Sequence, residues 1–156
     1  MPITLLHVKP IQSFEISSED QMQQFGLKLA TNLQIGDLII LEGPLGAGKT
    51  RLAQSIGKGL LVKSEITSPT FVIAKNYLGR TPFIHVDAYR LLDSPTGGLQ
   101  DLDLDTENSV TVVEWGKNFA EQLNDQYLLI SISIIDELTR ELKVSSIGDR
   151  WKSFNL

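Results

Sequence analysis

The sequence predicts an α/β fold: a three-layer domain with a mixed, mostly parallel central sheet. Strand-like apolar runs alternate with helical patterns along most of the chain, and two strand-like segments close it around a short turn. With 156 residues and 42% hydrophobic side chains, the chain is long enough for one full core and too short for two ordinary ones. We therefore expect residues 1–156 to form a single domain.

The first predicted element is an amphipathic helix over residues 18 to 33. Ser18 opens a Ser-x-x-Gln capping box with Gln21, which is a typical helix start. Apolar residues then recur at helical spacing, at Met22, Phe25, Leu29 and Leu33. Gly36 and Asp37 end the connection that follows.

The remaining elements alternate between strands and helices. Leu38 to Leu41 is a short apolar run bounded by turn residues, which favours a strand covered on both faces. A second helix is marked by Leu52, Ala53, Ile56 and Leu60. Further strands are expected at Phe71 to Tyr77, Phe83 to Asp87 and Val110 to Glu114, and a closing hairpin at Tyr127 to Ile135 and Arg140 to Ser146 around Asp136 and Glu137.

A glycine-rich turn joins the first predicted strand to the second helix. It matches the pattern G-x-x-x-x-G-K-[ST] at every fixed position, with Gly43, Pro44, Leu45, Gly46, Ala47, Gly48, Lys49 and Thr50. Glycines let successive N–H groups point inward, and the helix N-terminus adds further donors and a positive dipole end. The turn therefore predicts a phosphate-binding loop in which Lys49 contacts the β and γ phosphates and Thr50 binds Mg²⁺.

Two carboxylates stand at the C-terminal ends of predicted strands, where ligands bind in open α/β sheets. Asp87 ends the strand that begins at Phe83, and Glu114 ends the strand that begins at Val110. Either suits the acid that accompanies Mg²⁺ on a P-loop, and the spacing leaves open which is the metal ligand and which positions water. The alternative for each is a carboxylate that merely caps the next turn.

The segment 68–70 and His85 each allow a functional and a purely structural interpretation. Ser68-Pro69-Thr70 precedes a predicted strand, where P-loop enzymes often keep a loop that senses the γ-phosphate, and it equally suits a simple strand start. His85 shares a strand face with Asp87, and we favour a packed or supporting histidine over a proton shuttle.

Composition excludes several classes of function. The net charge of −5 predicts no strong attraction to nucleic acid or an anionic membrane, so any RNA would be held by a partner. Cysteine is absent, which excludes disulfides and thiolate metal sites, and neither a signal peptide nor a membrane span is visible. We expect a cytoplasmic protein.

Two charged segments, the acidic residues 101–105 and the basic C-terminal end, are predicted to lie on the surface. Acids alternate through residues 101–105, but Thr106 and Val112 replace the glycine and glutamate of a calcium loop, so this segment is interpreted as a mobile surface loop. The C-terminal end is locally basic, and scattered charges of this kind favour a solvated tail. Its cations are Arg140, Lys143, Arg150 and Lys152.

Taken in order, these motifs resemble the TsaE (YjeE) family, the P-loop ATPase of tRNA threonylcarbamoyladenosine biosynthesis. The matching stretches are GPLGAGKT at 43–50, SPTF at 68–71, HVDAYRL at 85–91 and VVEWG at 112–116. The resemblance implies a P-loop NTPase fold, ATP and Mg²⁺ as cofactors, and ATP hydrolysis that cycles a complex of the TsaB and TsaD proteins. It implies contact with tRNA only through those partners, and no DNA or membrane.

The resemblance also implies roles for individual residues. Lys49 binds phosphate and Thr50 binds Mg²⁺, while Glu114 is an active-site acid at the metal, Asp87 is the second essential acid and Thr70 belongs to the γ-phosphate-sensing loop. Trp115 matches as well, as an indole packed under the site or as a partner contact. This chain departs from the family pattern at Pro44, where an acid is usual, at Arg51, where a threonine is usual, and at the stretch SPTGG, residues 94–98.

Two other functions compete with an ATPase. A small-molecule kinase would need an arginine-bearing lid, and no Arg or Lys follows Arg90 until Lys117. A nucleotide-gated binding module would bind ATP without turnover. A GTPase is disfavoured because the sequence contains no Asn-Lys-x-Asp element.

Overall fold

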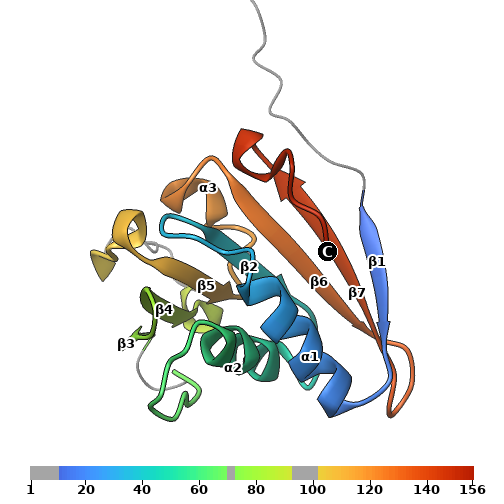
Figure 1. The fold of residues 1–156 in the computed structure, drawn as a ribbon. Coiled ribbons are helices and arrows are strands. Elements are labelled where there is room, and N and C mark those ends of the chain that lie inside the picture. The colour runs from blue at the N-terminus through green and yellow to red at the C-terminus, as the bar shows by residue number, and fades with distance from the viewer. Residues whose placement is uncertain (1–10, 70–72, 93–101) are drawn as a thin grey trace, which may run out of the picture.

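In the part of the chain that the computed structural model describes, residues 11–69, 73–92 and 102–156, seven strands form one sheet in the order β1-β7-β6-β2-β5-β4-β3 (Figure 1). The strands are β1 (Gln12–Ile16), β2 (Leu38–Glu42), β3 (Ala74–Leu78), β4 (Pro82–Asp87), β5 (Val110–Glu114), β6 (Tyr127–Ile134) and β7 (Arg140–Ile147). An α/β fold with a mixed sheet is therefore confirmed.

Parallel pairing is confined to the centre of this sheet. Strands β6, β2, β5 and β4 are parallel neighbours, while β3 pairs antiparallel with β4, β7 with β6, and β1 with β7. Because the central strands are parallel, β2, β4 and β5 all end at the same edge. In the register, Glu114 lies opposite both Leu41 on β2 and Asp87 on β4.

Helices cover both faces of the sheet and make the expected three layers. Helices α1 (Glu19–Ala30) and α2 (Lys49–Gly59) pack on one face, and the short α3 (Ala120–Leu123) packs on the other (Figure 1). Single-turn 3₁₀ helices lie at η1 (Tyr89–Leu91), η3 (Thr106–Asn108) and η4 (Asp149–Trp151). Strand β2 between the layers is buried on both faces at Leu38, Ile39, Ile40 and Leu41, and burial of each such side chain stabilises the fold by roughly 1.5–3 kcal/mol.

Helix α1 shows the predicted start. The Ser18 hydroxyl accepts a hydrogen bond from the Gln21 N–H at 3.1 Å. The Gln21 side chain reaches back to the N–H of Ser17, one residue earlier than in a standard capping box. The helix crosses α2 closely at Gly26, where an added Cβ would lie 2.4 Å from the Ser55 Cβ, so the spacing of the two helices depends on this glycine.

The strand predictions hold with small shifts. Strand β5 occupies the predicted residues, and β6 and β7 form the predicted antiparallel hairpin. Strand β3 begins at Ala74 rather than Phe71, and residues 70–72 lie outside the described part of the chain. Strand β1 and helix α3 were not predicted: α3 has only four residues, and β1 is identified as a strand by its pairing with β7 rather than by its own composition.

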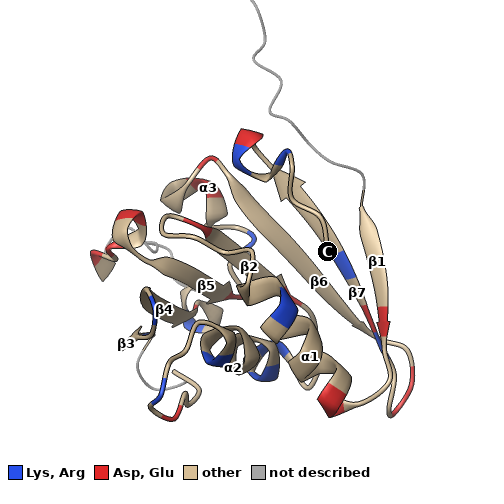
Figure 2. Cartoon of the chain, viewed as in Figure 1, with Lys and Arg blue, Asp and Glu red and all other residues tan. Residues whose placement is uncertain are grey.

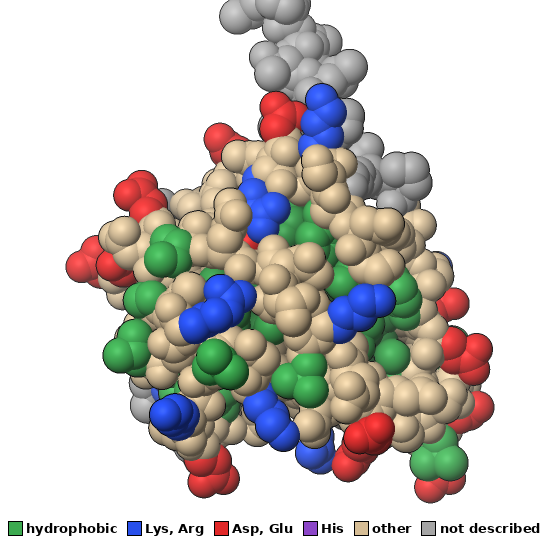
Figure 3. Space-filling model, in the orientation of Figure 1, with side chains coloured by type: hydrophobic (Ala, Val, Ile, Leu, Met, Phe, Trp, Pro, Cys, Tyr) green, Lys and Arg blue, Asp and Glu red, His purple; other side chains and the backbone are tan. Residues whose placement is uncertain are grey.

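Charge is unevenly distributed over the surface. Figure 2 shows Lys and Arg on α1 and α2, and Asp and Glu on the turns around α3 and at the tip of the β6–β7 hairpin. In Figure 3 the basic side chains on the α1–α2 face are separated from one another by polar and apolar atoms. Among the described residues, no helix is long and apolar enough to cross a membrane.

Candidate functional site

The predicted phosphate-binding loop, residues 43–50, runs from the end of β2 into the first turn of α2. Gly43 and Gly48 have φ angles of +152° and +109°, and a Cβ added at Gly43 would lie 2.6 Å from the Ile132 carbonyl oxygen of β6. No side chain caps the N-terminus of α2. The backbone N–H groups of its first turn are therefore available to an anion.

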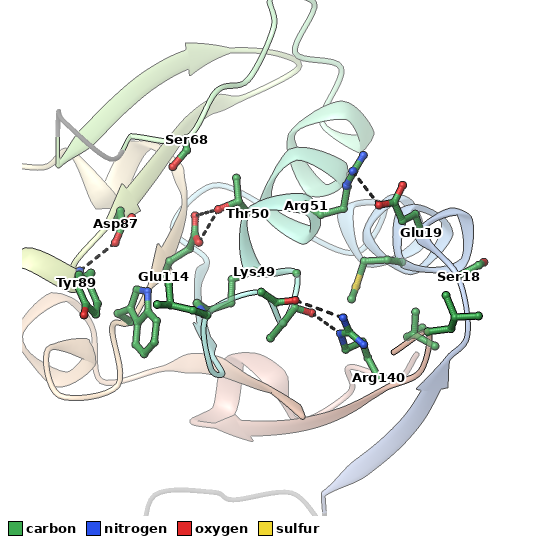
Figure 4. Close-up of a pocket in the computed structure, with 18 of the residues that line it drawn as sticks. Ser18, Glu19, Lys49, Thr50, Arg51, Ser68, Asp87, Tyr89, Glu114 and Arg140 are labelled. Atoms are coloured by element: carbon green, nitrogen blue, oxygen red, sulfur yellow. Dashed lines mark hydrogen bonds and ion pairs between the residues drawn. The ribbon is translucent and has the colours of Figure 1, made fainter. Parts of the chain in front are cut away.

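A pocket of about 660 Å³ lies against this loop (Figure 4). Its acidic and aromatic end is lined by Thr50, Asp87, Tyr89, Glu114 and Trp115. Its other end is lined by Ile16, Ser18 and Met22 around the start of α1, and by Leu138 and Arg140 of the β6–β7 hairpin. Residues 45–50 of the predicted loop and both predicted acids thus line one cavity, whereas Gly43 and Pro44 are not part of its lining.

Lys49 lies folded against its own loop. Its Nζ donates to the carbonyl oxygens of Gly43 at 2.6 Å and Pro44 at 3.0 Å, and it lies 3.9 Å above the centre of the Trp115 ring. The residue is only 5% exposed. The ammonium group is therefore held in place, with partners that phosphate oxygens can replace.

Two opposing effects act on the charge of Lys49. Burial lowers the pKa of the ammonium group below the usual 10.5 of a lysine, because desolvation disfavours the charged form. Three nearby carboxylates oppose this lowering of the pKa, in decreasing order Glu114, Glu42 and Asp87. These three carboxylates around Lys49 favour the binding of a further cation beside it.

Two side chains, those of Thr50 and His85, contact the carboxylate of Glu114. The Thr50 hydroxyl donates to its carboxylate, with Oγ1 lying 2.9 Å from Oε1 and 3.1 Å from Oε2 (Figure 4). Nε2 of His85 lies 2.6 Å from Oε2 of the same carboxylate. Glu114 is 3% exposed, so these contacts hold it in a protected position.

His85 is fully buried, and the packed position that we favoured for it is confirmed. Its Nε2 faces Glu114, while its Nδ1 has no hydrogen-bond partner among the described residues. An ionised carboxylate can only accept, so a proton between the two belongs on Nε2 when Glu114 is charged. The imidazole therefore supports Glu114 from behind the site.

Asp87 is placed more openly than Glu114. It is half-buried, and its Oδ1 accepts a hydrogen bond from the Tyr89 N–H at 3.0 Å. This is the turn-capping contact that we had set as the alternative to a functional role. Because the capping contact among the described residues occupies Oδ1 alone and Asp87 also lines the pocket, its second oxygen can take part in chemistry there.

The segment predicted to sense the γ-phosphate is only partly described. Ser68 lines the pocket, while Thr70 lies outside the described residues. Trp115 is half-buried with a φ of +62°, and its ring packs against Tyr89 at 5.1 Å between centroids. This packing fits the first of the two expected roles, an indole at the site, and the role as a partner contact stays a prediction. In residues 102–105, Asp103 and Asp105 are exposed, whereas Leu102 and Leu104 pack against the core.

Two basic residues that we expected in a solvated tail are engaged instead. Arg140 hydrogen-bonds backbone carbonyls of residues 46 and 47 and lines the pocket. Arg150 forms a two-point ion pair with Asp37, at 2.7 and 2.8 Å. The solvated-tail interpretation is wrong for both, because antiparallel β7 returns the chain along the sheet and brings Arg140 to the loop and Arg150 to Asp37, the residue before β2.

A magnesium-bound nucleotide suits the donors of this pocket. A threonine hydroxyl and carboxylate oxygens are the hard ligands that Mg²⁺ prefers. Among the described residues, no three His, Asp or Glu side chains group closely enough to hold a metal by themselves. Mg²⁺ commonly takes its remaining ligands from phosphate and water, so such a set is suited to a metal that arrives with its nucleotide.

Comparison with known proteins gives a consistent result. The family model "Threonylcarbamoyl adenosine biosynthesis protein TsaE" matches residues 16–142. A TsaE protein of Streptomyces coelicolor is 46% identical over 143 residues, covering 83% of this chain and 93% of that protein. A TsaE protein of Bacillus subtilis is 37% identical over 121 residues, covering 75% of this chain and 74% of that protein.

A solved structure shows the same fold. The crystal structure of YdiB from Bacillus subtilis superposes with a TM-score of 0.75 at 30% sequence identity. The superposition covers 94% of this chain and 92% of YdiB. Sequence and fold therefore point to the same relatives.

Proposed function

Because this chain belongs to the TsaE family of tRNA threonylcarbamoyladenosine biosynthesis, we propose that it is the Mg²⁺-dependent ATPase of that pathway. It would bind ATP through the loop Gly43, Pro44, Leu45, Gly46, Ala47, Gly48, Lys49 and Thr50 and hydrolyse it to ADP and phosphate. We further propose that residues 1–156 act as one P-loop domain in the cytoplasm, in keeping with the pathway's tRNA substrate.

The observation that carries this proposal is the Thr50–Glu114 hydrogen bond beside Lys49. It brings together groups from two segments of the chain: the lysine and hydroxyl proposed to bind phosphate and metal, both at the start of α2, and a buried acid at the end of β5. In phosphoryl transfer, catalysis is mostly positioning and neutralisation of charge, and these are the parts it requires. Lys49 would exchange its bonds to the Gly43 and Pro44 carbonyls for bonds to the β and γ phosphates.

The two acids take different parts in this proposal. When bound, Mg²⁺ neutralises charge on the phosphate oxygens and holds them in line for attack. Glu114 is buried and bonded to Thr50, which favours it as the acid on the metal side. Asp87 is more open and has one uncapped oxygen, which favours it as the group that orients the attacking water. Thr70 remains proposed as part of the γ-phosphate-sensing loop.

The partners proposed for this ATPase are the TsaB and TsaD proteins. Hydrolysis would return their complex to its starting state, without this chain performing the transfer to tRNA. The net charge of −5 and the scattered basic side chains of Figure 3 favour indirect contact with tRNA through those partners. A P-loop enzyme of this kind can be slow alone, so we expect weak basal hydrolysis that rises when the partners are added.

An ATPase assay of the wild type and the Lys49→Ala variant, each with and without TsaB and TsaD, tests the proposal. We expect ADP and phosphate in equal amounts from the wild type, faster release with the partners, and neither product from Lys49→Ala. ADP that forms only when a phosphate acceptor is added would instead support a kinase. If wild type binds ATP without hydrolysing it under any of these conditions, the nucleotide-gated binding module replaces the ATPase.

A further inference from the structure

Arg140, the first residue of β7, ties the β6–β7 hairpin to the phosphate-binding loop. Its Nε donates to the Ala47 carbonyl oxygen at 3.2 Å, and its Nη2 lies 3.4 Å from the Gly46 carbonyl oxygen (Figure 4). In the sequence, Ala47 and Gly46 lie 93 and 94 positions before Arg140. The guanidinium group therefore makes a tertiary contact with the backbone of the loop itself.

The hairpin turn holds the other side of the guanidinium group. Nη1 donates to the carbonyl oxygens of Asp136 at 2.9 Å and Thr139 at 3.1 Å, with Glu137 at 3.4 Å. The Asp136 carboxylate in turn accepts hydrogen bonds from the N–H groups of Leu138 and Thr139. The turn is thus fixed by its own contacts, and it presents a ready-made acceptor site for Arg140.

The carbonyls that Arg140 contacts control where the loop donors point. The Ala47 carbonyl and the Gly48 N–H belong to the same peptide group, and in a trans peptide they point in opposite directions. Holding the carbonyl toward Arg140 therefore aims the Gly48 N–H away from it. Gly48 has a φ of +109°, and since a glycine backbone is not restrained by a Cβ, contacts from outside the loop help to fix this conformation.

We propose that Arg140 is a positioning residue that holds the phosphate-binding loop in the shape in which it binds the β-phosphate. This inference rests on the proposed function, since it concerns the same nucleotide site. It adds a residue from the C-terminal hairpin that lies outside the P-loop and both acidic strands. Arginine suits the role because its planar fork bonds two separate backbone segments at once, which the single ammonium of a lysine cannot do.

The test is nucleotide binding and turnover of Arg140→Lys, which keeps the charge and loses the fork. The probes are Mg-ADP and a non-hydrolysable Mg-ATP analogue, measured by calorimetry. We expect both dissociation constants to rise about tenfold, as the loss of one or two charge-assisted hydrogen bonds implies, with KM rising in parallel. We expect kcat at saturating ATP to change by less than about threefold, because Thr50, Glu114 and Asp87 are untouched.

Two control variants separate this role from general stability. Lys143→Gln removes a cation from the same strand at an exposed position, and Arg150→Lys disturbs a comparable half-buried arginine away from the pocket. Both should bind Mg-ADP like the wild type, even if Arg150→Lys unfolds at a lower temperature. Amide hydrogen exchange should speed up at residues 45–48 in Arg140→Lys and in neither control.

Each outcome decides the inference. Wild-type affinity and loop exchange in a folded Arg140→Lys would overturn it, while leaving the proposed ATPase intact. If wild type itself fails to bind Mg-ADP, the proposed function fails first. If Arg140→Lys does not fold, Asp136→Ala, which removes the acceptor of the Leu138 and Thr139 N–H groups, tests the same contact from the turn: weaker Mg-ADP binding with faster exchange at 45–48 supports the inference, and unchanged binding overturns it.

Discussion

The hydroxyl of Thr50 lies 2.9 Å from one carboxylate oxygen of Glu114, although the two residues are 64 positions apart in the chain. One stands in the first turn of α2 and the other at the end of β5. They meet because β2 and β5 are parallel neighbours, so that the loop after β2 and the last residue of β5 share one edge of the sheet. The contact thus depends on the sheet topology.

The two acids should respond differently to magnesium when each is neutralised. Glu114→Gln should raise the Mg²⁺ concentration needed for half-maximal activity and lower kcat by about 10²-fold or more, since it removes charge at the proposed metal side. Asp87→Asn should lower kcat by a similar factor and leave the Mg²⁺ dependence near that of the wild type. Phosphate release measured across a Mg²⁺ titration distinguishes them, and the reverse pattern would exchange the two proposed roles.

His85 should act through its contact with Glu114. The side-chain amide of Gln reaches about as far as Nε2, whereas that of Asn reaches only as far as Nδ1, so His85→Gln can keep the bond and His85→Asn cannot. We expect kcat to fall about tenfold more in His85→Asn, with KM for ATP similar in both. Steady-state kinetics of the two variants decide this, and equal losses of kcat would reduce His85 to a packing role.

Removing the charge of Lys49 should stabilise the nucleotide-free protein near neutral pH. Burial lowers the pKa of Lys49 below 10.5, so at neutral pH the folded protein carries the cost of a desolvated charge. Between the lowered pKa and 10.5 the unfolded state binds more protons, and the wild type therefore gains stability as pH rises through that window.

Thermal melting of wild type and Lys49→Met across this pH range measures the effect. We expect Lys49→Met to melt higher at pH 7, and its advantage to shrink as the pH approaches 10.5. The same variant should lose binding of Mg-ADP, which serves as the control that the site has been altered. An advantage that does not change with pH would show that lost hydrogen bonds and packing dominate over the charge.

The Asp37–Arg150 ion pair should contribute to stability without contributing to the reaction. Asp37 is 3% exposed and accepts hydrogen bonds from both Arg150 and the Gln34 N–H. Asp37→Asn leaves the arginine without its counter-charge, and we expect a loss of roughly 2–3 kcal/mol in the free energy of unfolding, measured with urea. Glu141→Gln, in the exposed pair with Lys143, should change it by less than about 0.5 kcal/mol. Mg-ADP affinity should be unchanged in both variants.

Much of the site could be predicted because its signals are local in the chain. The loop 43–50 is encoded by its own glycines and the adjoining strand and helix, and Asp87 and Glu114 each end a strand whose apolar run is visible in the sequence. The rest depends on which strands become neighbours. The His85–Glu114 contact needs β4 beside β5, and neither sequence segment contains that information.

Arg140 shows the same limit most clearly. It is one of several scattered basic residues near the C-terminus, and no local pattern distinguishes it from Lys143. Once β6 is known to lie parallel to β2, the turn after β6 must fall at the edge that holds the loop, and the first residue of β7 falls there too. Strand β1 was missed for a related reason, since its pairing with β7 rather than its own composition makes it a strand.

The position of Trp115 gives the protein an intrinsic optical reporter. The sequence contains two tryptophans, and Trp151 is fully buried against Phe154, away from the pocket lining, whereas the indole of Trp115 carries the Lys49 ammonium on its face. A ligand that draws the ammonium off the ring removes a positive charge from beside the chromophore. Fluorescence of the unlabelled protein should therefore follow occupancy of the loop directly, and Trp115→Phe should abolish the signal while Trp151 remains as a constant background.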